Sequence, residues 1–191
     1  MIYTAYYQSP LGSVFLAAEE EALIGLWFEG QKYYRHSLAD GQAGRSGKAA
    51  ETEIAENADY PVLREAAGWL DRYFAGEKPA IAELRLAPRG SEFRQAVWDI
   101  LCRIPYGQVT TYGEIAKALA EKTGRKTMSA QAVGGAVGHN PISVIIPCHR
   151  VVGADGSLTG YAGGIDRKKS LLALEGADLS GLFTPKKGTA L

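Results

Sequence analysis

The 191-residue sequence contains only two cysteines and three histidines, and it has no long apolar run. Cys102 and Cys148 are far apart, and neither they nor the histidines follow the ligand spacing of a zinc site, so we expect no bound metal. No stretch approaches the roughly 20 apolar residues of a membrane span. The first residues lack the basic start and apolar core of a secretory signal. These absences predict a cytoplasmic protein with free thiols and no membrane association.

The formal net charge is zero, so the chain as a whole has no basic excess to attract nucleic acid. The charges are nevertheless divided along the chain. Residues 1–88 hold 8 basic and 13 acidic side chains, a net of −5, whereas residues 89–191 hold 13 basic and 8 acidic, a net of +5. Such a division can present a basic face to phosphate while the chain stays soluble, although chance segregation would give the same counts.

Residues 1–88 predict a small N-terminal α/β scaffold domain. Residues 36–59 show no sustained period and predict a long surface loop. Apolar side chains then recur at helical spacing over residues 61–76 and predict one helix. Before the loop, three short runs separated by turn residues favour a small antiparallel sheet, with strands at residues 2–7, 14–17 and 23–28.

Residues 89–191 predict a mostly helical C-terminal domain, so the fold class is α+β. Ser91 can cap a first helix, Thr111 a second one from Tyr112 onward, and Ser129 a third that extends to about Gly138. The last two, joined by a glycine-containing turn, outline a helix-turn-helix. The final helix carries mostly Ala, Val and Gly side chains. They allow either close approach to another surface or close packing against a neighbouring helix.

The segment Pro147-Cys148-His149-Arg150 follows an apolar run at residues 142–146 that predicts a short buried active-site strand. A cysteine beside a histidine has a possible base and an electrostatic reason to become a thiolate. Because adjacent strand residues point to opposite faces, the chain must turn there or a water must carry the proton. Glu175 is a candidate to orient the imidazole, unless it is only an exposed carboxylate at a helix end. By itself the Cys-His pair also fits a thiol hydrolase.

Six blocks between residues 90 and 176 occur in the order in which one known family has them. They are Phe93-Arg94-Gln95-Ala96-Val97-Trp98, Ile104-Pro105-Tyr106-Gly107, Thr111-Tyr112-Gly113, Ala132-Val133-Gly134, Gly138-His139-Asn140-Pro141 with Ile146-Pro147-Cys148-His149-Arg150-Val151, and Gly160-Tyr161-Ala162-Gly163-Gly164. These blocks resemble the O6-alkylguanine-DNA alkyltransferases, also called methylated-DNA–protein-cysteine methyltransferases. Ser9-Pro10-Leu11-Gly12 extends the resemblance more loosely into the first half.

The resemblance implies direct-reversal DNA repair by a monomer that needs no cofactor. The alkyl group of O6-alkylguanine in double-stranded DNA would pass irreversibly to Cys148 in a single turnover, with O4-alkylthymine left open as a second substrate. It implies that His149 draws the thiol proton through a water and that Glu175 orients His149. It also implies that Asn140 braces the active-site turn. Tyr112 would support nucleotide flipping and donate toward the departing base. The expected DNA and substrate contacts are Ser129, Gln131, Ala132, Gly134, Arg150, Tyr161, Ala162 and Gly163, of which Tyr161 to Gly163 wall the guanine pocket.

Gln131 departs from the family pattern, which usually has an arginine that fills the space left by the flipped nucleotide. Glutamine is shorter, uncharged and without a planar cationic face. We therefore expect flipping to be less well supported, unless Arg125 or Lys126 compensates electrostatically.

Two other protein classes fit parts of the sequence. A non-catalytic protein that recognises alkylated bases would lack the acceptor cysteine, whereas Cys148 is present. A transcription regulator would need bulky or bidentate side chains on its recognition helix, and residues 130–137 offer only Gln131.

Overall fold

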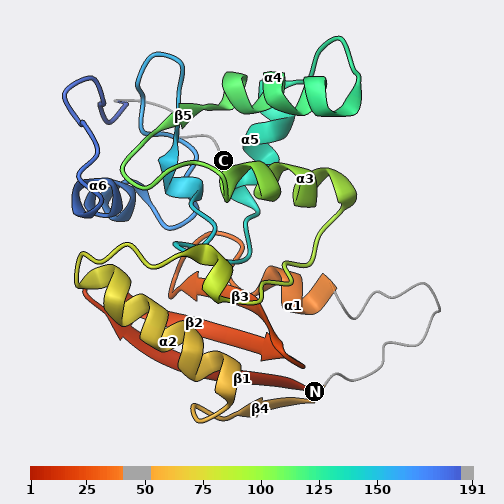
Figure 1. The fold of residues 1–191 in the computed structure, drawn as a ribbon, viewed down its shortest axis with the longest axis vertical. Coiled ribbons are helices and arrows are strands. Elements are labelled where there is room, and N and C mark those ends of the chain that lie inside the picture. The colour runs from red at the N-terminus through yellow and green to blue at the C-terminus, as the bar shows by residue number, and fades with distance from the viewer. Residues whose placement is uncertain (41–52, 186–191) are drawn as a thin grey trace. The chain divides into compact units, whose positions relative to one another are not determined.

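The computed structural model describes residues 1–40 and 53–185, and the chain divides into two units (Figure 1). The first unit is Met1–Gly90 together with Pro141–Ser143, and the second is Ser91–Asn140 with Val144–Leu191. The main boundary lies close to the one expected after residue 88. The assignment of Pro141–Ser143 to the first unit was not expected, because these residues lie within the predicted C-terminal domain.

A four-stranded sheet with the order β3-β2-β1-β4 forms the centre of the first unit. Its strands are β1 (Ile2–Ser9), β2 (Gly12–Glu19), β3 (Ala22–Phe28) and β4 (Ile54–Glu56). The first three pair antiparallel, which confirms the predicted meander, whereas β4 pairs parallel with β1. The sheet is packed against α2 (Pro61–Phe74), whose Leu63, Ala66 and Leu70 are buried.

The prediction of a surface loop over residues 36–59 was wrong at both ends. The short helix α1 (His36–Asp40) and strand β4 occupy these ends, and residues 41–52 lie outside the described residues. A three-residue strand is too short to show an alternating pattern, so β4 left no periodic signal. A 3-10 turn, η1 (Ile81–Glu83), precedes the end of this unit.

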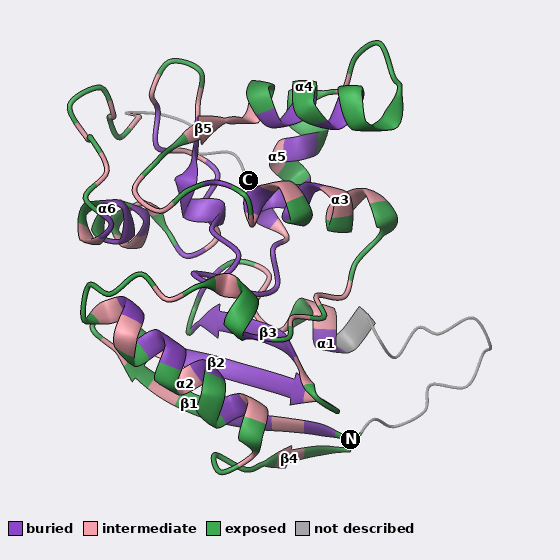
Figure 2. Ribbon diagram, viewed as in Figure 1, coloured by how far each residue is buried: buried purple, intermediate pink, exposed green. Residues whose placement is uncertain are grey.

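Strands β2 and β3 are buried along most of their length (Figure 2). Phe15 and Trp27 belong to one apolar cluster of this unit, and at Gly25 a Cβ atom would lie only 1.8 Å from the Trp27 ring. The outer edge of β3 also forms backbone hydrogen bonds. Leu26 donates its amide to Pro141 O at 2.8 Å, and Ser143 N donates to Leu26 O at 2.9 Å. The segment Pro141–Ser143 therefore lies along β3 like the start of a further strand.

The second unit is mostly helical, as predicted. Its helices are α3 (Glu92–Leu101), α4 (Tyr112–Thr123), α5 (Ala130–Gly138) and α6 (Ile165–Leu174), and β5 (Thr110–Thr111) pairs with β6 (Val151–Val152). Ser91, Thr111 and Ser129 cap their helices as expected, each accepting a backbone N–H of the first turn. Helix α5 packs on α3 and α4, which gives the helix-turn-helix. Among the described residues no helix is long and apolar enough to cross a bilayer.

Residues 142–146 do not form the predicted strand. Only Ile142 makes an isolated bridge, and Val144 adopts a left-handed conformation with φ of 68°. All five residues of this segment are buried. Its mostly apolar composition therefore reflects burial and not strand pairing. The short strand next to the cysteine is β6, which follows Cys148 instead of leading to it.

The cap of α4 can be tested by unfolding. Thr111→Val removes the hydroxyl that accepts from Glu114 N, and we expect it to lower the free energy of unfolding by about 1 kcal/mol. The control is Thr110→Val. Among the described residues the Thr110 hydroxyl donates to the Glu114 carboxylate and does not cap the helix, so this variant should change stability by no more than about 0.5 kcal/mol. Equal losses in the two variants, measured by urea denaturation, would show that the cap is not the source of the stability.

Candidate active site

A tight turn presents Cys148 at the start of the 3-10 helix η2 (Cys148–Arg150). Pro147, with φ of −82° and ψ of 62°, brings Cys148 N to 2.8 Å from Ile146 O, the geometry of an inverse γ-turn. Asn140, which follows α5, donates through Nδ2 to Ile146 O at 2.8 Å and to Cys148 Sγ at 3.0 Å. One amide therefore holds both the turn and the thiol, and the thiol residue is only 3% exposed.

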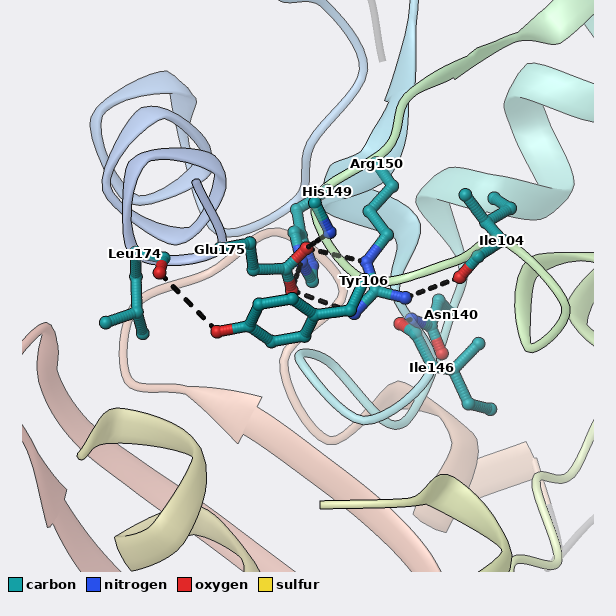
Figure 3. Close-up of polar contacts among 9 residues, drawn as sticks. Ile104, Tyr106, Asn140, Ile146, His149, Arg150, Leu174 and Glu175 are labelled. Carbon is teal, nitrogen blue, oxygen red and sulfur yellow. Dashed lines mark hydrogen bonds and ion pairs between the residues drawn. The ribbon is translucent and has the colours of Figure 1, made fainter. Parts of the chain in front are cut away.

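Glu175 lies inside the second unit and joins the two residues that follow the cysteine (Figure 3). His149 Nε2 lies 2.8 Å from Glu175 Oε1, and Arg150 donates to the same carboxylate from Nε at 2.8 Å and from Nη2 at 2.9 Å. Burial opposes the charge on Glu175, but the hydrogen bonds from His149 and Arg150 outweigh it and lower the pKa of the carboxyl. The carboxylate is thus ionised and acts only as an acceptor.

Arg150, expected from the sequence to contact DNA, makes internal contacts in this structure. Its side chain is 7% exposed, and besides the two bonds to Glu175 it donates to Ile104 O at 2.6 Å. The guanidinium also lies over the Tyr106 ring at 5.6 Å. With these partners, Arg150 is an internal counter-ion for Glu175. The pairing of Arg150 with Glu175 could not be predicted from the sequence because the two residues are 25 positions apart.

The ionised carboxylate decides which nitrogen of His149 carries the hydrogen. Because Glu175 only accepts, Nε2 must donate, which leaves the lone pair on Nδ1. Nδ1 is buried and has no hydrogen-bond partner among the described residues. Burial lowers the pKa of His149 even though Glu175 opposes this, so the ring is neutral at neutral pH. His149 therefore offers an unoccupied proton acceptor close to the cysteine in sequence.

The thiol is protonated in this state. Burial raises the pKa of Cys148 to about 11, although the hydrogen bond from Asn140 and the charge of Lys168 lower it in part. No hydrogen bond joins the Cys148 thiol to the His149 imidazole among the described residues. A proton leaving the sulfur for Nδ1 must consequently pass through an intervening group.

Lys168 was not predicted as a site residue, yet it is completely buried. Its Nζ donates to Val151 O at 2.5 Å and to Thr159 O at 2.6 Å, and burial lowers its pKa to about 8 despite the opposing influence of Cys148. In sequence, Arg167-Lys168-Lys169 resembles a solvated basic cluster. The helical spacing of Lys168 with Leu171 and Leu172, which are buried, is the signal that could have found it.

Two tyrosines lie near the thiol. Tyr112 donates to Thr159 O at 3.0 Å, and a Cβ atom at Gly160 would lie 2.0 Å from its hydroxyl. Burial raises the pKa of Tyr112 to about 12, and the charge of Cys148 adds to this rise. Tyr161 packs edge-on against the His149 ring, with 6.4 Å between ring centroids, and its buried hydroxyl has no partner among the described residues. Ala162 is half-buried beside it, and Gly163 faces the Tyr161 ring.

Helix α5 shows two different faces. Val133, Ala136 and Val137 are buried, and Trp98 Nε1 donates to Ala136 O at 2.9 Å. The predicted DNA contacts Ser129, Gln131 and Ala132 are exposed, while Gly134 is half-buried and would place a Cβ atom 3.8 Å from the Tyr112 ring. Close packing and an accessible small-residue surface thus occur on the same helix.

No set of three or more His, Cys, Asp or Glu side chains could hold a metal ion within the described ranges. Cys102, the second free cysteine, is half-buried at the end of α3, and burial raises its pKa to about 11.

Comparison with known proteins identifies the family. A model of the 6-O-methylguanine DNA methyltransferase DNA-binding domain matches residues 92–177, and a model of the ribonuclease-like domain of the same proteins matches residues 2–88. The chain belongs to the methylated-DNA–protein-cysteine methyltransferase family. Together the two models cover the chain apart from its ends and residues 89–91.

Relatives and solved structures agree with this family. The methylated-DNA–protein-cysteine methyltransferase of Methanosarcina acetivorans is 42% identical over 176 residues, which cover 92% of this chain and 99% of that protein. The crystal structure of Mycobacterium tuberculosis O6-methylguanine methyltransferase is 37% identical with a TM-score of 0.73, and covers 92% of this chain and 93% of its own. Mycobacterium tuberculosis OGT in complex with DNA is 38% identical with a TM-score of 0.71, covering 92% of each chain.

The buried carboxylate gives a pH-dependent prediction. An unfolded glutamate has a pKa of about 4.3, whereas the pKa of Glu175 is lowered in the folded protein. Glu175 therefore stabilises the fold at neutral pH, and this contribution is lost as the pH falls below about 4.3. Glu175→Gln should lower the free energy of unfolding at pH 7 by roughly 3 kcal/mol, because it leaves the Arg150 charge unpaired, and should weaken the acid dependence.

The control for this measurement is Asp99→Asn, which removes an exposed carboxylate 3.9 Å from Lys122 and should have little effect at any pH. Chemical denaturation of the three proteins between pH 3 and pH 8 makes the comparison. An unchanged acid slope in Glu175→Gln would mean that Glu175 does not titrate as the structure requires.

Proposed function

We propose that this protein repairs DNA by direct reversal, moving the alkyl group of O6-alkylguanine irreversibly onto Sγ of Cys148. The observation that carries the proposal is the cluster around the turn: a thiol held by Asn140 beside a neutral His149 whose Nε2 is fixed by Glu175. Membership of the methylated-DNA–protein-cysteine methyltransferase family supports the same reaction.

The chemistry begins with removal of the thiol proton. A water relays this proton from Cys148 to Nδ1 of His149, and Glu175 stabilises the imidazolium that forms. The thiolate attacks the alkyl carbon, the C–S bond forms, and the bond from that carbon to O6 breaks. The electron pair stays with guanine, and the proton that His149 received returns through water to neutralise the departing base. Tyr112 and the backbone amides of residues 161–163 are the donors for the developing charge.

Tyr112 must release one hydrogen bond to serve in this way, since its hydroxyl donates to Thr159 O. Lys168 donates to the same carbonyl at 2.6 Å. When Tyr112 turns toward the base, the Thr159 carbonyl therefore keeps a donor, and the cost of a buried unsatisfied carbonyl is avoided. Lys168 also places a positive charge where it stabilises the thiolate.

The DNA is engaged through the second unit. A base inside a duplex hides its O6 group, so the alkylated nucleotide must rotate out to reach a buried sulfur. The exposed small residues of α5 suit close approach to the minor groove, with Gln131 entering the space that the nucleotide leaves. The net charge of +5 that 13 basic and 8 acidic side chains give residues 89–191 favours approach to phosphate. We assign the protein to the cytoplasm, as a monomer without a cofactor.

Mass spectrometry after incubation with O6-methylguanine DNA tests the reaction. We expect one methyl group per protein molecule on the peptide that contains Cys148, no gain in Cys148→Ala, and an unchanged gain in Cys102→Ala. Repeated turnover with an unmodified cysteine would instead indicate a hydrolase, and binding of the DNA without transfer would indicate a recognition protein.

Gln131→Arg should increase the rate of transfer from duplex DNA. A guanidinium that stacks in the vacated space contributes about 1 kcal/mol, which corresponds to roughly a fivefold faster reaction. Gln131→Lys adds the charge without the planar face and should gain less. On single-stranded DNA, where no partner base closes the gap, the three proteins should react alike. An unchanged or lower rate of Gln131→Arg on duplex DNA contradicts the expectation.

A further inference from the structure

The active-site turn is interrupted by three residues that belong to the other unit. Asn140 and Val144 are part of the second unit, but the intervening Pro141–Ser143 belong to the first. The strand β3 holds them through two backbone hydrogen bonds, from Leu26 N to Pro141 O and from Ser143 N to Leu26 O. The segment between Asn140 and Cys148 is therefore held at Pro141–Ser143 by backbone hydrogen bonds to β3.

Gln31 adds a side-chain bond at this place. Its Oε1 accepts from Phe28 N at 2.8 Å and from the Ser143 hydroxyl at 3.2 Å. Gln31 is 6% exposed and Ser143 is 1% exposed, so neither group exchanges its partner for water without local opening. Gln31 therefore fixes its own loop through Phe28 and also connects that loop to Ser143, 112 positions away in sequence.

The backbone next to Ser143 needs such support. Val144 has φ of 68°, a conformation that β-branched residues avoid, and such residues persist only when their surroundings hold them. Beyond Val144, the carbonyl of Ile146 accepts from both Asn140 Nδ2 and Cys148 N. A small rotation at Ser143 and Val144 would thus change the geometry between Asn140, Ile146 O and the sulfur.

We propose that Gln31 is a positioning residue for alkyl transfer: through Ser143 it fixes the turn that runs from Asn140 to Cys148. This inference rests on the proposed function. It assigns the N-terminal unit a role in the reaction, since Gln31 and β3 hold Pro141–Ser143 in the register that aligns the thiol.

Single-turnover kinetics with O6-methylguanine duplex DNA separates positioning from binding. Gln31→Leu removes the acceptor, and Ser143→Ala removes the hydroxyl that donates to it. We expect Gln31→Leu to lower the maximal rate about tenfold or more, as misplacement of a reacting group does, with the half-saturating DNA concentration within about twofold of the parent protein. The double variant with Gln31→Leu and Ser143→Ala should react no more slowly than Gln31→Leu alone, because both substitutions remove the same hydrogen bond. Gln31→Glu, which keeps an acceptor oxygen, should recover most of the rate.

Labelling with iodoacetamide in the absence of DNA gives an independent readout. If the turn is loosened locally, Cys148 should react faster in Gln31→Leu while Cys102 keeps its parental rate, so labelling and methyl transfer change in opposite directions. The matched control is Gln8→Leu, which removes an exposed glutamine that donates to Ser13 in the same sheet and should change neither rate.

The outcomes are distinct. A maximal rate of Gln31→Leu within twofold of the parent, a change confined to half-saturation, or effects of the two substitutions that multiply would each overturn the proposal. Faster labelling of both cysteines would overturn it as well, because it would show a general loss of stability. If the parent protein transfers no methyl group to Cys148, the proposed function fails, and the labelling comparison alone decides whether Gln31 holds the turn.

Discussion

The buried carboxylate of Glu175 is the constraint on which the site depends. At 5% exposure it would favour the neutral form, and only its donors keep it charged. They include His149 and Arg150, together with the Gly107 amide at 3.1 Å. Because these donors must stay close to the carboxylate, they fix the position of Gly107 before α4, of Glu175 at the end of α6, and of His149 and Arg150 after the cysteine. The tautomer of His149 is a consequence of this arrangement and not a separate feature.

The same environment keeps the cysteine unreactive until a substrate arrives. With its pKa near 11, the thiol holds its proton at neutral pH, and its burial limits contact with other electrophiles. The groups that favour the thiolate, namely the Asn140 amide, the Lys168 charge and the free Nδ1 of His149, are already in place. What a bound alkylguanine adds is the electrophilic carbon and the exclusion of bulk water. Reactivity is therefore tied to recognition of the damaged base.

Local signals predicted most of the fold, because helix caps and the strand pattern depend on neighbours in sequence. Ser91, Thr111 and Ser129 each fix a helix start through one hydroxyl and one nearby amide. The features that were not predicted depend on distant partners. Arg150 bonds a carboxylate 25 positions away, and Gln31 bonds a hydroxyl 112 positions away. Residues 142–146 have strand-like composition only because they are buried on all sides, which periodicity cannot distinguish from pairing.

The composition of α5 follows from the two surfaces that one short helix must serve. Its glycines are poor helix formers, so the helix depends on the Ser129 cap, the Trp98 bond to Ala136 O and burial of its valines. On the buried side small residues admit close neighbours, and Gly134 leaves room for the Tyr112 ring. On the exposed side the small side chains leave a surface with few projecting groups, which suits the close approach to DNA that we propose. Gln131 is the one long side chain on the exposed face of α5, so the proposed entry into a duplex falls to this single position.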